Sequence, residues 1–436
     1  MTTSTALLTD HYELTMLQAA LASGHADRRC VFETFARRLS GGRRYGVVAG
    51  TGRVLEALRD FRFGEAELAF LRERTVVDGR TLDWLADFRF SGDIWGYAEG
   101  EVYFPGSPVL VVESTFAEGI LLETLVLSIL NHDSAVASAA SRMTAAAGDR
   151  PCIEMGSRRT HEESAVAAAR AAYLAGFGST SNLEAGRRHG IPTAGTAAHS
   201  YTLLHSDERE AFANQLSSLG LSTTLLVDTY DVTTAVQLAV ELAGPELGGV
   251  RLDSGDLVSQ AHEVRAQLDA LGAHDTQIVV TSDLDEYAIA ALAAAPVDRY
   301  GVGTRVVTGS GHPAAGMVYK LVSRESTDGR MEGVAKASKE KTSVGGRKFA
   351  LRRRSPHGVA QAEIVGIDER PWADGADGDD RELLVPLVRA GEVVSATDVH
   401  TAREHHAKAR AELPLGALRL SGGDPAIPTR YLDDWS

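Results

Sequence analysis

Between Pro151 and Val322 the chain alternates short apolar runs with alanine-rich stretches. Each apolar run ends in polar residues and is followed by a helical pattern. Strands that are buried on both faces by helices read as apolar runs of this kind. We predict seven such strands, within residues 152–155, 176–179, 192–199, 223–231, 248–256, 277–283 and 299–304.

Seven strands that each precede a helix favour an irregular α/β barrel. In such a fold the functional side chains lie at the carboxyl ends of the strands. An open, doubly wound parallel sheet would give the same local pattern, so the closure of the barrel is an inference. We place this domain at residues 147–325.

The regions on either side of this domain have a different pattern of apolar and polar residues. Residues 1–146 mix helices and strands, as in an α+β domain, with a helix at 8–24, a strand at 107–116 and a buried helix at 120–143. Residues 326–436 form a C-terminal lid and capping segment, with strands in 345–353 and 383–388 and a helix at 401–413. The acidic, glycine-rich stretch 373–380 is typical of a surface loop.

Composition narrows the class of protein. The net charge of −15 disfavours nucleic acid and anionic membranes as partners. Two cysteines are too few for a disulfide framework or a four-cysteine zinc site, which indicates a reducing compartment. With no export signal and no run of about 18 apolar residues, we expect a cytoplasmic enzyme.

Two strand ends carry residues suited to catalysis. His199 follows Thr196 at one of them and could act as a base, a metal ligand or a phosphate acceptor, or be held structurally at the rim. The run VRLDSGDL places Arg251 close to Asp253 and Asp256, with Ser254 between the two aspartates. This pair of carboxylates could bind ribose hydroxyls or hydrated Mg²⁺, and the arginine could bind a carboxylate or phosphate. The alternative is a capped turn that enters a helix.

Other strand ends are suited to anions. Gly301, Gly303 and Thr304 in GVGT can bring backbone amides close to a phosphate, although a structural turn has the same pattern. Arg158 and Arg159 add positive charge, unless they are surface arginines. Together these residues indicate a sugar that carries phosphate and pyrophosphate, beside a small carboxylate.

A basic stretch lies farther along the chain, at residues 336–348. It contains Lys336, Lys341, Arg347 and Lys348. Such a stretch can cover phosphates as a lid or can be a solvated loop, and we favour the solvated loop.

These motifs, in their order and spacing, resemble the nicotinate phosphoribosyltransferase family over most of the chain. The resemblance rests on LTDHYELTM, FETFARRL, YGVVAG, the block from FRFSGDIW to VLVVE, EMGSRR, STSNLEAGRRHGIPTAGTAAHS, VRLDSGDL, GVGTRVVTG and VYKLV. It implies a type II phosphoribosyltransferase fold and a homodimer whose active sites are shared between the subunits.

The resemblance also implies roles for individual residues. Tyr12 is similar to the aromatic residue that stacks on nicotinate in the partner subunit. Thr196 and Arg251 resemble nicotinate-site residues, and Thr304 resembles a ligand of the 5-phosphate. His199 matches the histidine that ATP phosphorylates in this family.

The implied reaction joins nicotinate to phosphoribosyl pyrophosphate, the first step of NAD salvage from nicotinate, with ATP as co-substrate and Mg²⁺ accompanying the phosphates. Asp253 and Asp256 are the residues expected to stabilise the cationic sugar or hold its hydroxyls. Val344 stands where a proline is common in the family, and this difference affects the conformation expected for the lid. The zinc site of some relatives is not possible with two cysteines.

Three alternatives remain open. A related enzyme could act on nicotinamide or quinolinate, although an arginine facing the ring favours one carboxylate. A non-catalytic barrel could sense phosphorylated sugars. A metal-dependent barrel enzyme is disfavoured because no clustered ligand pattern follows the strands, and we expect no protein-bound metal site.

Overall fold

The chain divides by its internal contacts into two compact units. The computed structural model describes residues 4–336, 344–370, 380–395 and 398–432. One unit comprises residues 1–138 and 312–436, and the other comprises residues 139–311. This differs from the predicted three-part division, because strand β12 (Met317–Glu325) pairs with β1 (Arg29–Ala36) in the first unit and not with the parallel strands of the second unit.

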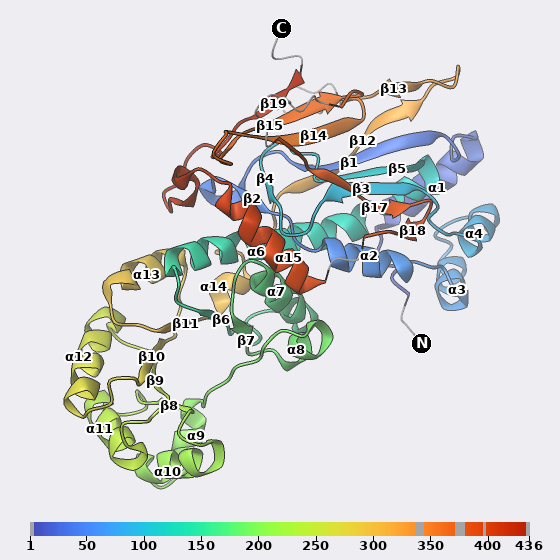
Figure 1. The fold of residues 1–436 in the computed structure, drawn as a ribbon. Coiled ribbons are helices and arrows are strands. Elements are labelled where there is room, and N and C mark those ends of the chain that lie inside the picture. The colour runs from blue at the N-terminus through green and yellow to red at the C-terminus, as the bar shows by residue number, and fades with distance from the viewer. Residues whose placement is uncertain (1–3, 337–343, 371–379, 396–397, 433–436) are drawn as a thin grey trace. The chain divides into compact units, whose positions relative to one another are not determined.

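The first unit is built on an antiparallel sheet that joins early and late parts of the chain (Figure 1). In spatial order its strands are β13 (Met331–Gly333), β12, β1, β5 (Leu110–Thr115), β3 (Asp93–Tyr97), β17 (Leu384–Arg389) and β18 (Glu392–Val393). The other sheets are β16 (Arg381–Glu382), β14 (Lys348–Arg354), β15 (Ala360–Ile367) and β19 (Thr429–Tyr431), and the pair β2 (Gly46–Val47) and β4 (Val102–Tyr103).

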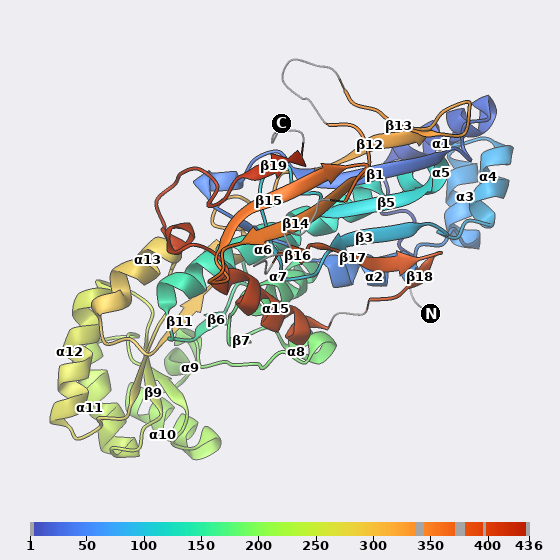
Figure 2. The ribbon, with the colours of Figure 1, turned by 45° about the horizontal axis from the view of Figure 1, so that its top comes forward.

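Helices lie around the sheets of this unit (Figure 2). They are α1 (His11–Ser23), α2 (Thr51–Arg59), α3 (Glu65–Glu73), α4 (Gly79–Ala86), α5 (Phe116–Ile120) and α15 (Val399–Ala411). Of these, α5 contacts the large sheet at β1 and β5. The Asp10 side chain caps the amino end of α1, and Gly24, with φ +73°, ends it in the left-handed conformation. The predicted helices at 8–24 and 401–413 and the strand at 107–116 are therefore confirmed.

Helix α6 (Glu123–Ala147) is the predicted buried helix, and it begins in the first unit and continues into the second. Leu125, Leu130, Ala137 and Met143, which are spread along the helix, are each at most 2% exposed. Such burial on most sides explains why the segment lacks an amphipathic pattern.

The predicted strands near the C-terminus are present as β14 and β17. The predicted surface loop at 373–380 lies outside the described residues except for Asp380. That carboxylate accepts the Arg354 N–H at 3.1 Å and forms an ion pair with Arg353 at 3.2 Å. Asp380 is therefore held against β14.

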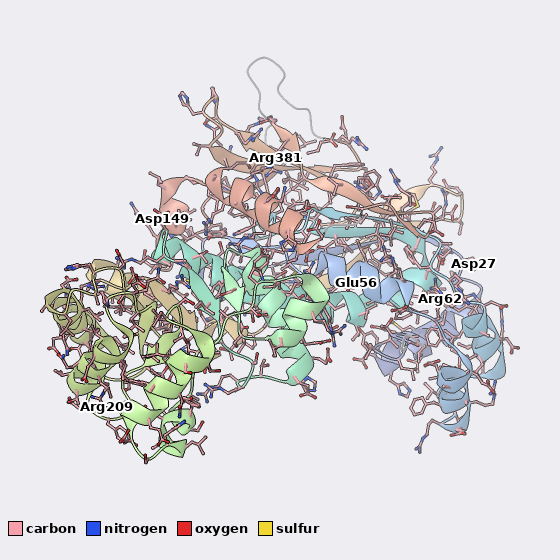
Figure 3. All side chains as sticks on the ribbon, turned by 60° about the horizontal axis from the view of Figure 1, so that its bottom comes forward. Asp27, Glu56, Arg62, Asp149, Arg209 and Arg381 are labelled. Atoms are coloured by element: carbon pink, nitrogen blue, oxygen red, sulfur yellow. The ribbon has the colours of Figure 1, made fainter. Side chains whose placement is uncertain are left out.

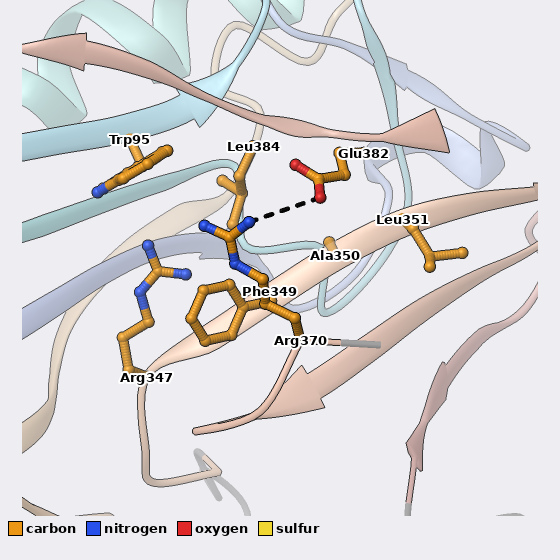
Figure 4. A pocket seen from close by; sticks show the side chains of 8 residues that line it. All are labelled: Trp95, Arg347, Phe349, Ala350, Leu351, Arg370, Glu382 and Leu384. Carbon is orange, nitrogen blue, oxygen red and sulfur yellow. Dashed lines mark ion pairs between the residues drawn. The ribbon is translucent and has the colours of Figure 1, made fainter. Parts of the chain in front are cut away.

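The prediction of a solvated loop at 336–348 is wrong for Arg347 and Lys348, which are packed in the first unit, whereas Lys336 is exposed. Lys348 is buried and forms an ion pair with Glu33 at 2.8 Å. Arg347 forms an ion pair with Glu113 at 2.9 Å, and its guanidinium lies 3.8 Å from the centroid of the Phe349 ring. Figure 4 shows Arg347 beside Phe349 and Trp95 in a small cavity of the first unit. Lys341 lies outside the described residues.

The second unit contains one parallel sheet of six strands. Its order is β7 (Ser179–Thr180), β6 (Cys152–Glu154), β11 (Arg299–Val302), β10 (Gln277–Val280), β9 (Gly249–Leu252) and β8 (Thr224–Leu226). Six of the seven predicted strands are therefore confirmed. The prediction for residues 192–199 is wrong, since only Thr193 forms a bridge, to Thr180, and His199 begins a helix.

Helices follow the strands of this unit as predicted. They are α7 (Glu162–Leu174), α8 (Leu183–His189), α9 (His199–Leu204), α10 (Glu208–Leu219), α11 (Val232–Ala243), α12 (Leu257–Ala270), α13 (Glu286–Ala291) and α14 (Thr304–Val307). The fold class is α/β, as the alternation of strands and helices indicated.

Residues 192–199 link the two edges of the sheet. Next to β7, the Ala194 N–H donates to Thr180 O at 2.9 Å. Farther along, Arg251 Nη1 donates to Ala197 O at 2.9 Å, and His199 Nδ1 lies 3.1 Å from Thr229 Oγ1, just beyond β8. The edge strands are thus connected through a few backbone and side-chain contacts of one segment, whereas a regular barrel would close through a strand ladder.

Candidate active site

A cavity of about 240 Å³ lies at the carboxyl ends of the parallel strands in the second unit. Strands β6, β11, β10 and β9 are neighbours in the sheet, so the loops that follow them meet at one edge. These loops line the cavity with Met155, Arg158, Arg159, Arg251, Asp253, Thr281, Ser282, Asp283, Gly301, Gly303 and Thr304. The structure therefore brings together cationic, acidic and glycine-containing segments that are far apart in the sequence.

Arg251 projects from β9 and is held from two sides. Its side chain is 12% exposed. Nη1 donates to Ala197 O at 2.9 Å and to the Thr196 hydroxyl, whereas Nη2 is 3.5 Å from Asp253 Oδ1. Nε has no hydrogen-bond partner among the described residues. Because Nε is buried, the donor capacity that remains for a carboxylate ligand is that of Nη2.

Asp253 follows directly after β9 and is fixed by neighbouring strands. Its N–H donates to Asp228 Oδ2 at 2.9 Å, and its carboxylate accepts a hydrogen bond from the Thr281 hydroxyl. Ser254 Oγ also donates to Asp228 Oδ2, at 2.8 Å. This turn is thus anchored to the end of β8, and it directs the Asp253 carboxylate into the cavity.

His199 is the first residue of α9, and its side chain is 41% exposed. Its Nδ1 is 3.1 Å from Thr229 Oγ1, and its Nε2 is 4.0 Å from Asp253 Oδ2. One ring nitrogen is therefore held by a hydroxyl, while the other lies near a cavity carboxylate. The structure places the predicted pair His199 and Asp253 side by side.

Arg158 and Arg159 lie in the exposed turn after β6, and the described residues provide neither guanidinium with an ion pair. Next to this turn, at the end of the neighbouring strand β11, Gly303 precedes the short helix α14, whose first residue is Thr304. Two free guanidinium groups in one small cavity create an environment that favours a multiply charged anion.

Two predicted residues lie elsewhere. Asp256 caps α12, where its carboxylate accepts the Ser259 N–H at 3.2 Å, and this bond helps to lower the pKa of the aspartate. The alternative prediction of a capped turn therefore describes Asp256. Tyr12 belongs to the first unit, where it is 42% exposed on α1, and burial of its hydroxyl beside Glu123 raises the pKa of the tyrosine to about 12.

The end of β10 contributes lining residues to which sequence reasoning gave no role. Thr281 binds the Asp253 carboxylate, and Ser282 and Asp283 are exposed in the cavity. Ser282 has φ +132°, a conformation that is favourable only for glycine. The sequence signal was the polar TSD run after QIVV, which marks a strand end but does not reveal the strained backbone.

Replacing Ser282 with glycine should raise the melting temperature and lower the turnover rate. The substitution removes strain worth about 1–3 kcal/mol, and this gain exceeds the entropic cost of a new glycine, about 0.5–1 kcal/mol. Ser217 on the exposed face of α10 provides the control, because Ser217→Gly in a helix should lower the melting temperature. A lower melting temperature in Ser282→Gly would show that the strain is not significant.

The fold and the cavity define an α/β protein whose cavity at the carboxyl ends of parallel strands is suited to an anionic ligand. Residues 7–131 match the family described as nicotinate phosphoribosyltransferase (NAPRTase) N-terminal domain. Over 434 residues the chain is 57% identical to nicotinate phosphoribosyltransferase pncB1 of Mycobacterium tuberculosis, covering 98% of this chain and 95% of that protein. The chain belongs to the nicotinate phosphoribosyltransferase family.

Other comparisons agree with this assignment. The nicotinate phosphoribosyltransferase of Bacillus subtilis is 37% identical over 381 residues, covering 84% of this chain and 77% of that protein. The crystal structure of human nicotinic acid phosphoribosyltransferase has a TM-score of 0.81 at 26% identity and covers 97% of each chain.

Among the described residues, none of the helices is long and apolar enough to span a membrane.

Proposed function

We propose that this protein is a nicotinate phosphoribosyltransferase that forms nicotinate mononucleotide and pyrophosphate from nicotinate and phosphoribosyl pyrophosphate. The observation that carries the proposal is one cavity lined by Arg158, Arg159 and Arg251 together with Asp253. The relatives named above support the choice of substrates. The product would enter NAD synthesis.

The phosphate groups would lie on the side of the cavity formed by the turn after β6 and the GVGT turn. Arg158 and Arg159 are long, exposed cations without ion-pair partners among the described residues, and Thr304 offers a hydroxyl. Guanidinium groups bind phosphate oxygens through paired hydrogen bonds. This side would therefore hold the more highly charged substrate.

Nicotinate would lie with its carboxylate toward Arg251. Arg251 keeps donor capacity on Nη2, whereas its Nε is buried and its Nη1 is fully used by Ala197 O and the Thr196 hydroxyl. A fixed cation of this kind favours a carboxylate over the uncharged amide of nicotinamide. Thr196 would act by holding the guanidinium in place.

The chemical step is a displacement at the anomeric carbon of ribose. The bond from this carbon to a pyrophosphate oxygen breaks, and its electron pair leaves with pyrophosphate, while the ring nitrogen of nicotinate forms the new bond. Positive charge develops on the sugar during this exchange. The Asp253 carboxylate, fixed by Thr281 and by Asp228 through its backbone, would stabilise that charge.

Magnesium would accompany the phosphates of the substrates. No cluster of three or more potential ligands from His, Cys, Asp and Glu occurs among the residues described. Asp253 and Asp283 nevertheless give the cavity two carboxylates, which suits an ion that takes one or two carboxylates and binds substrate phosphates. Bound Mg²⁺ would neutralise charge on the departing pyrophosphate.

ATP would act through His199. In this step Nε2 attacks the γ-phosphorus of ATP and ADP leaves, and water later cleaves the phosphorus–nitrogen bond to release phosphate. The exposure of the imidazole, and the contact of Nδ1 with Thr229, support Nε2 as the reacting atom. The new negative charge near Asp253 would reorganise the cavity during each turnover.

A homodimer with shared sites would bring Tyr12 of one subunit to the barrel of the other. Mixing Tyr12→Ala subunits with Arg251→Ala subunits tests this, because each variant alone lacks one component of every site. Random exchange at equal concentrations should restore about a quarter of the wild-type activity, since half of the dimers carry one intact site. Failure to regain activity after verified subunit exchange would contradict the shared site.

Release of pyrophosphate from phosphoribosyl pyrophosphate tests the proposed activity. We expect release that depends on nicotinate. Tight binding of phosphoribosyl pyrophosphate without release in the presence of nicotinate would instead support a sensor.

A further inference from the structure

A buried carboxylate lies directly before the arginine pair. Glu154 is the last residue of β6 and is 1% exposed. It has no ion-pair partner among the described residues, and burial raises the pKa of its carboxyl group. A carboxylate in this position is costly to bury, so its contacts call for an explanation beyond strand formation.

Both oxygens of Glu154 are used to hold neighbouring segments. Oε1 accepts the N–H of Gly156, two residues ahead, and Oε2 accepts the Thr180 hydroxyl of β7 at 2.6 Å. In the parallel ladder Glu154 is paired with Thr180. The side chain therefore connects the end of β7 to the first residues of the turn that carries Arg158 and Arg159.

A second hydrogen bond holds the same turn from the other side. Asn182 Nδ2 donates to Ser157 Oγ at 3.0 Å, and the Asn182 N–H donates to Thr180 Oγ1 at 3.0 Å. Asn182 also caps α8 through its Oδ1. Glu154, Thr180 and Asn182 thus form one connected network around the turn.

Packing leaves this turn little freedom. A Cβ atom on Gly156 would lie 2.2 Å from Val307 Cγ1 and 3.0 Å from Gly303 O, so the backbone rests directly on the GVGT segment. Arg159 N–H closes the turn by donating to Gly156 O at 2.8 Å. Residues 155–159, here named the arginine loop, are therefore fixed by their backbone while their guanidinium groups stay exposed.

We propose that Glu154 is a positioning residue for the arginine loop, which it holds, together with the Asn182–Ser157 hydrogen bond, so that Arg158 and Arg159 can bind the phosphates of phosphoribosyl pyrophosphate. The inference rests on the proposed function for the identity of the ligand. A long cation binds an anion well only when its backbone is fixed, since small displacements at a site weaken catalysis strongly.

Glu154→Ala should raise the KM for phosphoribosyl pyrophosphate about 10- to 100-fold and leave the KM for nicotinate within about twofold. Glu154→Gln keeps the size of the side chain and an acceptor for Gly156, so it should restore most of the affinity. A purely structural role would lower kcat through loss of active protein and would leave both KM values unchanged. Glu163→Ala provides the matched control, because it removes an exposed carboxylate of α7 that forms an ion pair with Arg188 of α8.

A combined variant separates positioning from direct contact. If Glu154 acts only through the arginines, then Glu154→Ala should cause no further loss in a protein that already carries Arg158→Ala and Arg159→Ala. Independent, multiplying losses would overturn the proposal. If Glu154→Ala does not fold, Ser157→Ala weakens the same loop at its surface and should raise the same KM about 3- to 10-fold; an unchanged KM there would also overturn it.

Binding of inorganic pyrophosphate, measured by calorimetry, distinguishes failure of this inference from failure of the proposed function. Pyrophosphate should bind the wild-type protein and bind Glu154→Ala more weakly, whatever reaction the protein catalyses. Equal affinity in the two proteins would refute the positioning role alone. Absence of phosphoribosyl pyrophosphate turnover in the wild type, with the difference in pyrophosphate affinity intact, would refute only the proposed function.

Discussion

Arg251→Ala should raise the KM for nicotinate about 100-fold or more, because it removes a nearly buried cation from a charge-assisted contact worth about 2–5 kcal/mol. The KM for phosphoribosyl pyrophosphate should change much less, since the arginine loop remains. Steady-state kinetics with each substrate varied in turn measure both values.

Two control variants make this test specific to the guanidinium group of Arg251. Arg251→Lys keeps the charge but loses the planar fork, and we expect it to recover only part of the affinity. Arg209→Ala removes an exposed arginine on α10 that pairs with Glu241, and should leave both KM values unchanged (Figure 3). An effect of Arg251→Ala that is confined to phosphoribosyl pyrophosphate would contradict the assignment to the nicotinate carboxylate.

His199→Asn should abolish the incorporation of acid-labile phosphate from ATP and, with it, the stimulation of product formation by ATP. Asparagine retains a polar group that can reach Thr229, so α9 should keep its position while the reactive nitrogen is lost. Labelling with γ-³²P-ATP, followed by acid treatment, measures the phosphorylated fraction.

His205 provides the matched control for that experiment. It lies at the end of the same helix, and its Nδ1 is 2.9 Å from Tyr201 O. His205→Asn should be labelled as the wild-type protein is. Full labelling of His199→Asn, or loss of label only in His205→Asn, would move the phosphorylation site away from His199.

Much of the α/β unit followed from the sequence because parallel strands have a simple signature. Apolar runs such as QIVV can only be buried strands or helices, and their short length decides for strands. The same reasoning failed for the segment 192–199, which we predicted to form a strand. Its pattern of small residues gives no preference for a ladder, and tertiary contacts to Arg251 and Thr180 decide its extended course.

The candidate site was predictable where chemistry and strand position coincide, as at Arg251 and Asp253. Asp256 shows the limit of this approach. Both aspartates lie in one short run. Asp253 follows β9 and lines the cavity, whereas Asp256 caps α12. Glu154 was missed because a buried acid and an exposed acid look alike in sequence, and only the structure reveals its two hydrogen bonds.

The two-unit division could not be anticipated either. Strand β12 follows the last strand of the parallel sheet in the chain, and nothing in its sequence indicates that it pairs with β1, almost three hundred residues earlier. Long-range antiparallel pairing of this kind is set by the matching of side chains on both strands. Local periodicity therefore finds the strand but not its sheet.

Formation of nicotinate mononucleotide is the most direct test of the central claim. Purified protein would be incubated with phosphoribosyl pyrophosphate and Mg²⁺, with and without ATP, and with nicotinate, nicotinamide or quinolinate in parallel. We predict product from nicotinate only, increased by ATP. Product from another pyridine in preference to nicotinate, or no product from any of the three, would contradict the proposed function.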